Sequence, residues 1–215
     1  MARRANCNAL FDILMADPFM DTSEARHFIY RALSVRPKPG DIRKTRLDAP
    51  RPSANVPALV DNLWEWKRAD GFPSRRHAAF ADARFEICRQ RKGVPCRVAL
   101  LAPYRLCQAV GLEDSKEHQE CSSLPKFLCK ALGESWLGSP LDQKSEAGRL
   151  WMPCLSKTEI AFLFGTVEPL RQVRDELWQL IRYWEGVRLL ESPLDADVRG
   201  ELFFEAHEGY QVWPM

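Results

Sequence analysis

The stretch that most constrains the fold is EPLRQVRDELWQLIRYWEGVRLLES, residues 168–192. Its apolar side chains recur with the i, i+3, i+4, i+7 spacing of one helix face. These side chains are Leu170, Val173, Leu177, Leu180, Ile181, Trp184 and Val187. Pro169 suits a first-turn position, and Pro193 lies where a helix would stop. The pattern therefore predicts an amphipathic helix over this stretch.

Helical and β-prone segments are mixed along the rest of the chain. Helices are predicted around residues 59–66 and over 123–137. Strands are predicted over residues 75–81, 94–102, 149–155 and 158–167, and a last hairpin over 202–204 and 210–213. TSEARHFIYRALS, residues 22–34, fits either a helix or a helical turn that leads into a strand. Because no regular βαβ alternation appears, we expect an α+β fold in one domain of 215 residues.

Between the first segments and the predicted helix at 59–66 lies an irregular region, residues 35–57. It contains five prolines and little periodicity, which is typical of a long functional or disordered loop. Basic residues are dense from Arg36 to Arg51, so this loop could contact phosphate or could simply be solvated. The net charge of the whole chain is only +2, which argues against general nucleic-acid binding.

The N-terminal residues and the cysteines bear on the compartment. Residues 5–16 read as a short amphipathic helix within an N-terminal helical extension, residues 1–24. Asn and Asp residues interrupt its apolar patch, so we expect no signal peptide, and no stretch reaches the ~20 apolar residues of a membrane span. Seven scattered cysteines without a C-x-x-C pair argue against a zinc site or a disulfide framework. We therefore expect a cytoplasmic protein that does not contact membranes, or one delivered by a signal-independent route.

Three short motifs carry the functional prediction. In FIYRALS, Arg31 lies inside a β-prone run; in FPSRRHAAFA, Ser74 opens a strand after a turn; in GELFFEAHEGYQV, Glu201 opens a late strand. In this order they resemble the mono-ADP-ribosyltransferase superfamily of the Arg–Ser–Glu type. The resemblance spans most of the chain but rests on these motifs, and the second reads Pro73-Ser74-Arg75 in place of the full Ser-Thr-Ser signature.

The resemblance implies a fold and roles for the site residues. The implied fold is a split pair of small antiparallel sheets with flanking helices and an NAD-binding cleft between them. Arg31 would grip the pyrophosphate of NAD, because a guanidinium binds phosphate oxygens bidentately. Glu201 would stabilise positive charge on the ribose, and Ser74 would hold the ribose or orient Glu201. An aromatic side chain would stack on nicotinamide, and the candidates are Tyr30, Trp64, Trp66 and Phe80.

Each of these residues also has a plainer interpretation. Arg31 on a helix would be a solvated cation, Ser74 a turn residue and Glu201 a surface acid. Glu205 is the alternative catalytic acid, because residues four apart on an unbulged strand face the same side. His77 and His207 have no second ligand pattern nearby, so no metal site is expected.

The resemblance also implies partners. We expect an NAD-dependent toxin or effector that transfers ADP-ribose to a protein or nucleic-acid acceptor. An antitoxin or immunity protein would cover the cleft. The alternative is a non-enzymatic α+β binding module whose basic loop and aromatic patch contact a protein or a nucleic acid. Convergence of Arg31, Ser74 and Glu201 on one cleft is the feature that separates the two.

Overall fold

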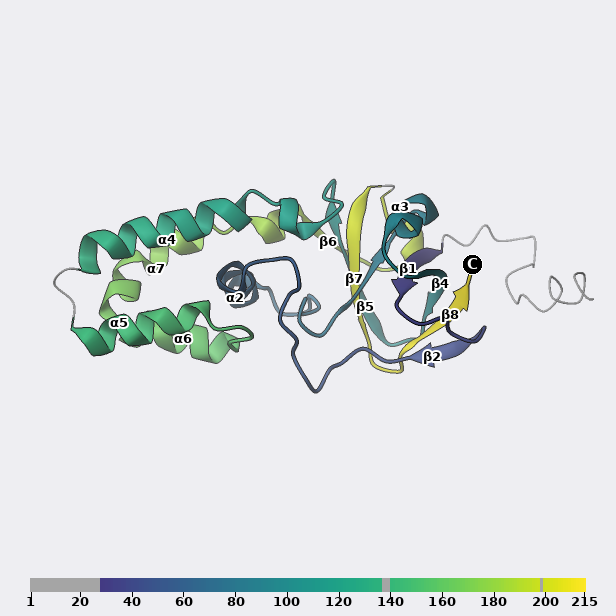
Figure 1. The fold of residues 1–215 in the computed structure, drawn as a ribbon, viewed down its shortest axis with the longest axis horizontal. Helices are drawn as coiled ribbons and strands as arrows, with labels where there is room; N and C mark the ends of the chain where they lie inside the picture. Colours follow the sequence, from purple (N-terminus) through teal and green to yellow (C-terminus); the bar gives the residue numbers. More distant parts are fainter. Residues whose placement is uncertain (1–27, 137–139, 198) are drawn as a thin grey trace, which may run out of the picture.

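The computed structural model describes residues 28–136, 140–197 and 199–215. The helix expected at residues 5–16 and the rest of the N-terminal extension lie outside these ranges. The described chain is an α+β fold with one eight-stranded antiparallel sheet and six α-helices, which confirms the predicted class. Figure 1 shows the sheet at one end of the molecule, helices α4 to α7 at the other end and α2 between them.

The strands are β1 (Ile29–Leu33), β2 (Asp41–Arg43), β3 (Ala79–Asp82), β4 (Val94–Leu100), β5 (Tyr104–Val110), β6 (Val187–Leu190), β7 (Gly200–Ala206) and β8 (Tyr210–Pro214). The helices are α2 (Ala58–Lys67), α3 (Phe85–Gln90), α4 (Glu120–Trp136), α5 (Leu141–Gly148), α6 (Lys157–Thr166) and α7 (Glu168–Leu180). Short 3-10 helices include η1 (Ser115–Glu117), η2 (Arg149–Trp151) and η3 (Tyr183–Gly186). None of the helices in these ranges combines the length and apolar character needed to cross a bilayer.

The strand order is β2-β8-β4-β1-β3-β7-β5-β6. The first four strands form one half-sheet and the last four form a second half-sheet. The halves meet where β1 pairs with β3 through a single residue pair, Tyr30 with Asp82. By contrast, β1 pairs with β4 over five residues and β3 with β7 over four. Two separate small sheets were expected; the observed sheet is continuous and narrows to one pair at this junction.

The last two strands are not a hairpin, contrary to the prediction. β7 pairs with β3 and β5, whereas β8 pairs with β2 and β4 in the other half-sheet. The turn at residues 207–209 therefore carries the chain from one half-sheet to the other. Every residue of β7 is buried. Phe203 packs in one hydrophobic core and Phe204 in a second, so β7 is a central strand covered on both faces.

The first core lies between the sheet and the helices. Trp64 of α2, Leu128 of α4, Phe164 of α6 and Leu177 of α7 pack together there with Phe203 of β7. The second core is built mostly from strand residues, including Ile29, Val98, Leu202, Phe204 and Val212. Both faces of the sheet are therefore packed, and β1 and β3 each contribute residues to the second core, Ile29 from β1 and Ala79 and Ala81 from β3.

Helices α2, α4 and α7 and strand β4 lie where the sequence predicts them, whereas several other predictions were wrong. Residues 158–167 form helix α6 in place of a strand, and residues 149–155 contain η2 and irregular chain. The capping box of Ser156 with Glu159 explains the start of α6. Helix α7 ends at Leu180, and Val187–Leu190 is β6 in place of more helix. Residues 75–77 form a turn, so β3 begins only at Ala79.

Candidate functional site

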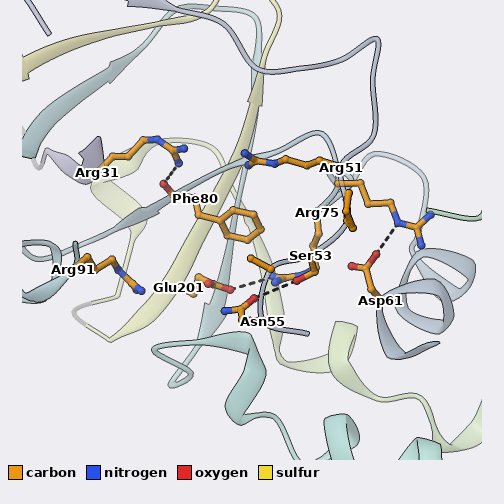
Figure 2. A pocket seen from close by; sticks show the side chains of 12 residues that line it. Arg31, Arg51, Ser53, Asn55, Asp61, Arg75, Phe80, Arg91 and Glu201 are labelled. Carbon is orange, nitrogen blue, oxygen red and sulfur yellow. Dashed lines mark hydrogen bonds and ion pairs between the residues drawn. The ribbon is translucent and has the colours of Figure 1, made fainter. Parts of the chain in front are cut away.

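A cleft of about 370 Å³ lies beside the β1–β3 junction (Figure 2). Its lining comes from β1, the Pro-rich segment, α2, the turn before β3, β3, the residue after α3 and the start of β7. The charged side chains in this lining are five arginines and two carboxylates: Arg31, Arg51, Arg75, Arg76, Arg91, Asp61 and Glu201. The cleft is therefore strongly basic, which favours an anionic ligand.

Arg31 extends from β1 into this cleft and does not lie on a helix. Its Nη1 donates a hydrogen bond to the carbonyl oxygen of Phe80 in β3. The β1–β3 ladder has only one residue pair, at Tyr30. In a longer ladder a backbone amide of β1 would bind the Phe80 carbonyl, whereas here the Arg31 side chain binds it. Among the described residues, Arg31 Nε is buried without a hydrogen-bond partner. Arg31 therefore joins the two half-sheets, and its side chain also lines the cleft.

Glu201 enters the same cleft from the start of β7. The residue before it, Gly200, has φ +143°, and a Cβ there would lie 2.5 Å from the carbonyl oxygen of Ala109. Only glycine allows this close approach of β7 to β5. The backbone amide of Glu201 donates to the carbonyl of Leu112 at 2.7 Å. The position of Glu201 is thus set by the backbone on both sides of the residue.

The Glu201 carboxylate is held by a buried polar group. Ser115 Oγ donates to Oε2 at 2.5 Å, and Arg75 Nη1 donates to the same oxygen at 3.1 Å. The Tyr183 hydroxyl contacts Ser115 Oγ at 3.1 Å and accepts from Arg75 Nη1 at 2.7 Å. In the part of the chain that the structure describes, the hydrogen bonds of this carboxylate all fall on Oε2. The second oxygen, Oε1, is therefore the one available to a ligand in the cleft.

Arg75 is the charge that balances Glu201. Its Cζ lies 4.9 to 5.5 Å from the centroids of four aromatic rings, those of Phe80, Tyr183, Phe203 and Trp64. Burial by itself lowers the pKa of Arg75, but Tyr183 and Glu201 outweigh it, so the pKa is raised and the guanidinium stays charged. Burial raises the pKa of Tyr183 to about 12, so its hydroxyl is neutral and can donate. The group is therefore an ion pair supported by aromatic faces.

Ser74 is not part of the cleft lining. Its Oγ donates to Glu65 at 2.9 Å, and its backbone amide donates to Glu205 at 2.8 Å. Glu205 also lies 3.9 Å from Arg105. Ser74 and Glu205 thus contact each other away from the cleft, and the serine that touches Glu201 is Ser115. No local pattern indicated the contact between Ser115 and Glu201, because the two residues are separated by 86 positions.

Of the four aromatic candidates, Phe80 lines the cleft. Trp64 is buried in the first core, where it stacks on Tyr183 at 3.9 Å and donates from Nε1 to Glu120. Trp66 stacks on Phe164 within the helical layer. Tyr30 makes an edge contact with the ring of Phe85 at 5.8 Å. An aromatic contact to a ligand in the cleft is therefore left to Phe80.

The other charges of the cleft differ in how they are paired. Arg76 is bound to Asp61 at 2.8 Å, and Arg91 binds Asp82 at 2.6 and 2.8 Å. Arg31 and Arg51 form no ion pair within the described ranges. Arg31 donates to the carbonyl of Phe80 in β3, and Arg51 donates to the carbonyl of Ala78, the residue before β3. Two arginines without a carboxylate partner at one cleft are what an anionic ligand would neutralise.

Comparisons with known proteins give no further indication: no family model, no curated protein and no solved structure matches this chain. Among the residues that the structure describes, no group of three or more His, Cys, Asp or Glu side chains could hold a metal ion. The geometry of the cleft is therefore the basis for assigning a function to this protein.

Proposed function

We propose that this protein is an NAD-dependent mono-ADP-ribosyltransferase-like toxin or effector that transfers ADP-ribose to a macromolecular acceptor. One observation carries the proposal. Arg31 of β1 and Glu201 of β7 line one cleft from strands separated only by β3. A fixed cation and a fixed carboxylate in one cleft are the two charges that the cleavage of NAD requires.

The chemistry assigns a role to each charge. The guanidinium of Arg31 binds the pyrophosphate, with Arg51 as a second donor. In the transfer, the bond between ribose C1′ and the nicotinamide nitrogen breaks, and nicotinamide leaves with the bonding electron pair. The acceptor nucleophile forms a new bond to C1′ and loses its proton. Positive charge develops on the ribose, and Glu201 Oε1 stabilises it, as a carboxylate does in glycoside cleavage.

The arrangement of strands supports this assignment. Strands β1 and β7 contain Arg31 and Glu201, and β3 is the strand that follows Ser74. These three strands are consecutive in the sheet. The sheet is narrowest between β1 and β3, which is where the split implied by the resemblance would lie. Hydrogen bonding to Glu201, the role expected of Ser74, is made here by Ser115. An antitoxin or immunity protein over the cleft rests on the resemblance alone, whereas the expected cytoplasmic location rests on the cysteine pattern of the sequence.

Nicotinamide release tests the proposal. Purified protein is incubated with NAD and cell lysate, and free nicotinamide is measured by chromatography. We expect release by the wild type, its loss in Glu201→Gln and no change in Glu208→Gln, since Glu208 is exposed in the turn after β7. Arg31→Lys keeps the positive charge but loses the bidentate fork, so it should weaken NAD binding and raise KM. Folding of each variant is checked by thermal unfolding, because Glu201 is paired with a buried arginine.

A non-enzymatic binding module is the second candidate. It is favoured by the internal contacts of the same residues: Glu201 Oε2 is bound by Arg75 and Ser115, and Arg31 Nη1 is bound by Phe80. Such contacts are also what a purely structural network would show. No nicotinamide release from the wild type, together with no heat of NAD binding in calorimetry, would refute the first function and favour the second.

A further inference from the structure

A second, smaller pocket of about 180 Å³ adjoins the cleft and shares two of its lining residues, Arg31 and Arg51. The other charged or titratable side chains in its lining are Lys44, Arg46, His77 and Tyr210. No Asp or Glu belongs to the lining among the residues described. Lys44 and Arg46 are exposed, so a macromolecule can reach them. The two pockets together present cations on both sides of Arg31 and Arg51.

The segment that supplies these cations is held against the sheet. Thr45 Oγ1 donates to the carbonyl of Ala206 at 2.9 Å and accepts from its amide at 3.2 Å. The carbonyl of Arg46 accepts from His77 Nδ1 at 2.7 Å. Arg51 donates from its amide to the carbonyl of Arg76 at 3.2 Å. The cations are therefore presented by an ordered backbone, which lowers the entropy lost when a ligand binds.

The charges in this pocket repel one another. Burial lowers the pKa of Arg51, and the nearby positive charges of Arg31 and Arg46 lower it further. A pocket that brings like charges together without a carboxylate is stabilised when an anion binds. Phosphate suits such a pocket, because its oxygens accept two hydrogen bonds from one guanidinium.

We propose that this pocket binds the phosphodiester backbone of a nucleic-acid strand, so that the acceptor of the transfer is a nucleic acid. The inference rests on the proposed function and names its acceptor class. A strand has a phosphate at every nucleotide. One phosphate in the second pocket therefore leaves the next nucleotides free to extend past Arg31 and Arg51 toward Glu201. The apolar part of the lining is only Ala78, Ala79 and the buried Tyr210, which offers little to the side chains of an acidic peptide.

Fluorescence anisotropy with a labelled single-stranded RNA and DNA 20-mer, without NAD, tests the binding. We expect the double variant Lys44→Glu/Arg46→Glu to bind at least about tenfold more weakly than wild type. The slope of log K against log salt should fall by about 1.4, which is about 0.7 for each lost contact to a single strand. The matched control is Lys126→Glu/Lys130→Glu, two exposed lysines of α4 in the helical end of the molecule. This control should bind like the wild type.

The second arm tests the acceptor. Wild type is incubated with NAD and the 20-mer, and mass spectrometry looks for the addition of one ADP-ribosyl group to the oligonucleotide. Addition by the wild type and its loss in Lys44→Glu/Arg46→Glu would support the inference. Nicotinamide release without oligonucleotide binding would overturn the inference and leave the proposed function intact. Equal competition by poly-glutamate would overturn it in favour of an acidic protein. Binding without nicotinamide release would overturn the acceptor role together with the proposed function.

Discussion

Replacing Ser115 by alanine tests whether the buried group around Glu201 holds a charged carboxylate. The Ser115 hydroxyl donates to Glu201 Oε2 at 2.5 Å and is buried. A hydrogen bond to a charged group contributes about 1.5–3 kcal/mol, and a neutral one about 0.5–1.5 kcal/mol. We therefore expect Ser115→Ala to lower the free energy of unfolding by about 2 kcal/mol. In the Glu201→Gln background the same change should lower it by only about 1 kcal/mol.

Urea unfolding followed by tryptophan fluorescence measures both values. With an m-value of about 2 kcal/mol/M, a loss of 2 kcal/mol moves the midpoint by about 1 M, which is easily resolved. The control Ser123→Ala changes an exposed serine of α4 and should stay within about 0.5 kcal/mol of wild type. The four proteins of the Ser115 and Glu201 series form a double-mutant cycle. An equal cost of Ser115→Ala in both backgrounds would refute the charged hydrogen bond.

Three further predictions concern the backbone, the thiols and a helix cap. Gly200→Ala should lower the free energy of unfolding by about 1–3 kcal/mol, because Gly200 has a positive φ and lies close to a carbonyl oxygen. Gly133→Ala in α4, where a Cβ would meet nothing within 4 Å, should raise the free energy of unfolding by about 0.5–1 kcal/mol. Urea unfolding measures both changes. Burial raises the pKa of the Cys107 thiol to about 12, so peptide mapping after labelling the native protein at pH 8 should find exposed Cys129 modified long before Cys107. Ser156→Ala should cost about 1 kcal/mol in urea unfolding at pH 7. The hydrogen bonds from Ser156 lower the pKa of Glu159 in the folded protein. Their contribution to stability is therefore present above the unfolded pKa of about 4.3 and is lost as pH falls through the folded pKa. A cost of Ser156→Ala that is unchanged at pH 3 contradicts this account.

Local patterns in the sequence predict much of the fold. Helix α2, helix α4 and the start of α7 follow from apolar spacing and end signals within one segment. Helix α6 was missed because its dense apolar run reads equally as a buried strand, although Ser156 and Glu159 form a capping box at its start. The capping signal, read before the apolar run, would have resolved that ambiguity.

Partner choice between strands could not be predicted in the same way. β7 and β8 are joined by a tight turn, and a short turn between two β-prone runs is the usual sign of a hairpin. Each strand instead pairs with two others, and β7 pairs with β5 over seven residues. The pairing of β7 depends on which strands can bury Phe203 on one face of the sheet and Phe204 on the other. No local sequence pattern contains that information.

The residues of the candidate site also differ in whether a local sequence pattern could reveal them. Arg31 and Glu201 were found because each lies in a short motif at a strand, and the structure places both at one cleft. Ser115, which binds Glu201, and Tyr183, which contacts Ser115, were missed because both belong to segments that are distant from Glu201 in sequence. Arg75 lies next to Ser74 in the second motif, yet its role depends on four aromatic rings, one each from α2, β3, η3 and β7.

The narrow β1–β3 junction connects the fold to the proposed chemistry. A ladder that continued past Tyr30 would bind the Phe80 carbonyl with a backbone amide and would leave Arg31 no place at the junction. Because the ladder stops, one side chain closes the sheet and also places a cation in the cleft. Removing Arg31 altogether therefore perturbs fold and ligand binding together, whereas Arg31→Lys can still donate to Phe80 and lacks only the fork. A loss of NAD binding in Arg31→Lys at unchanged thermal stability would separate the two roles, and a parallel loss of both would assign Arg31 to the sheet.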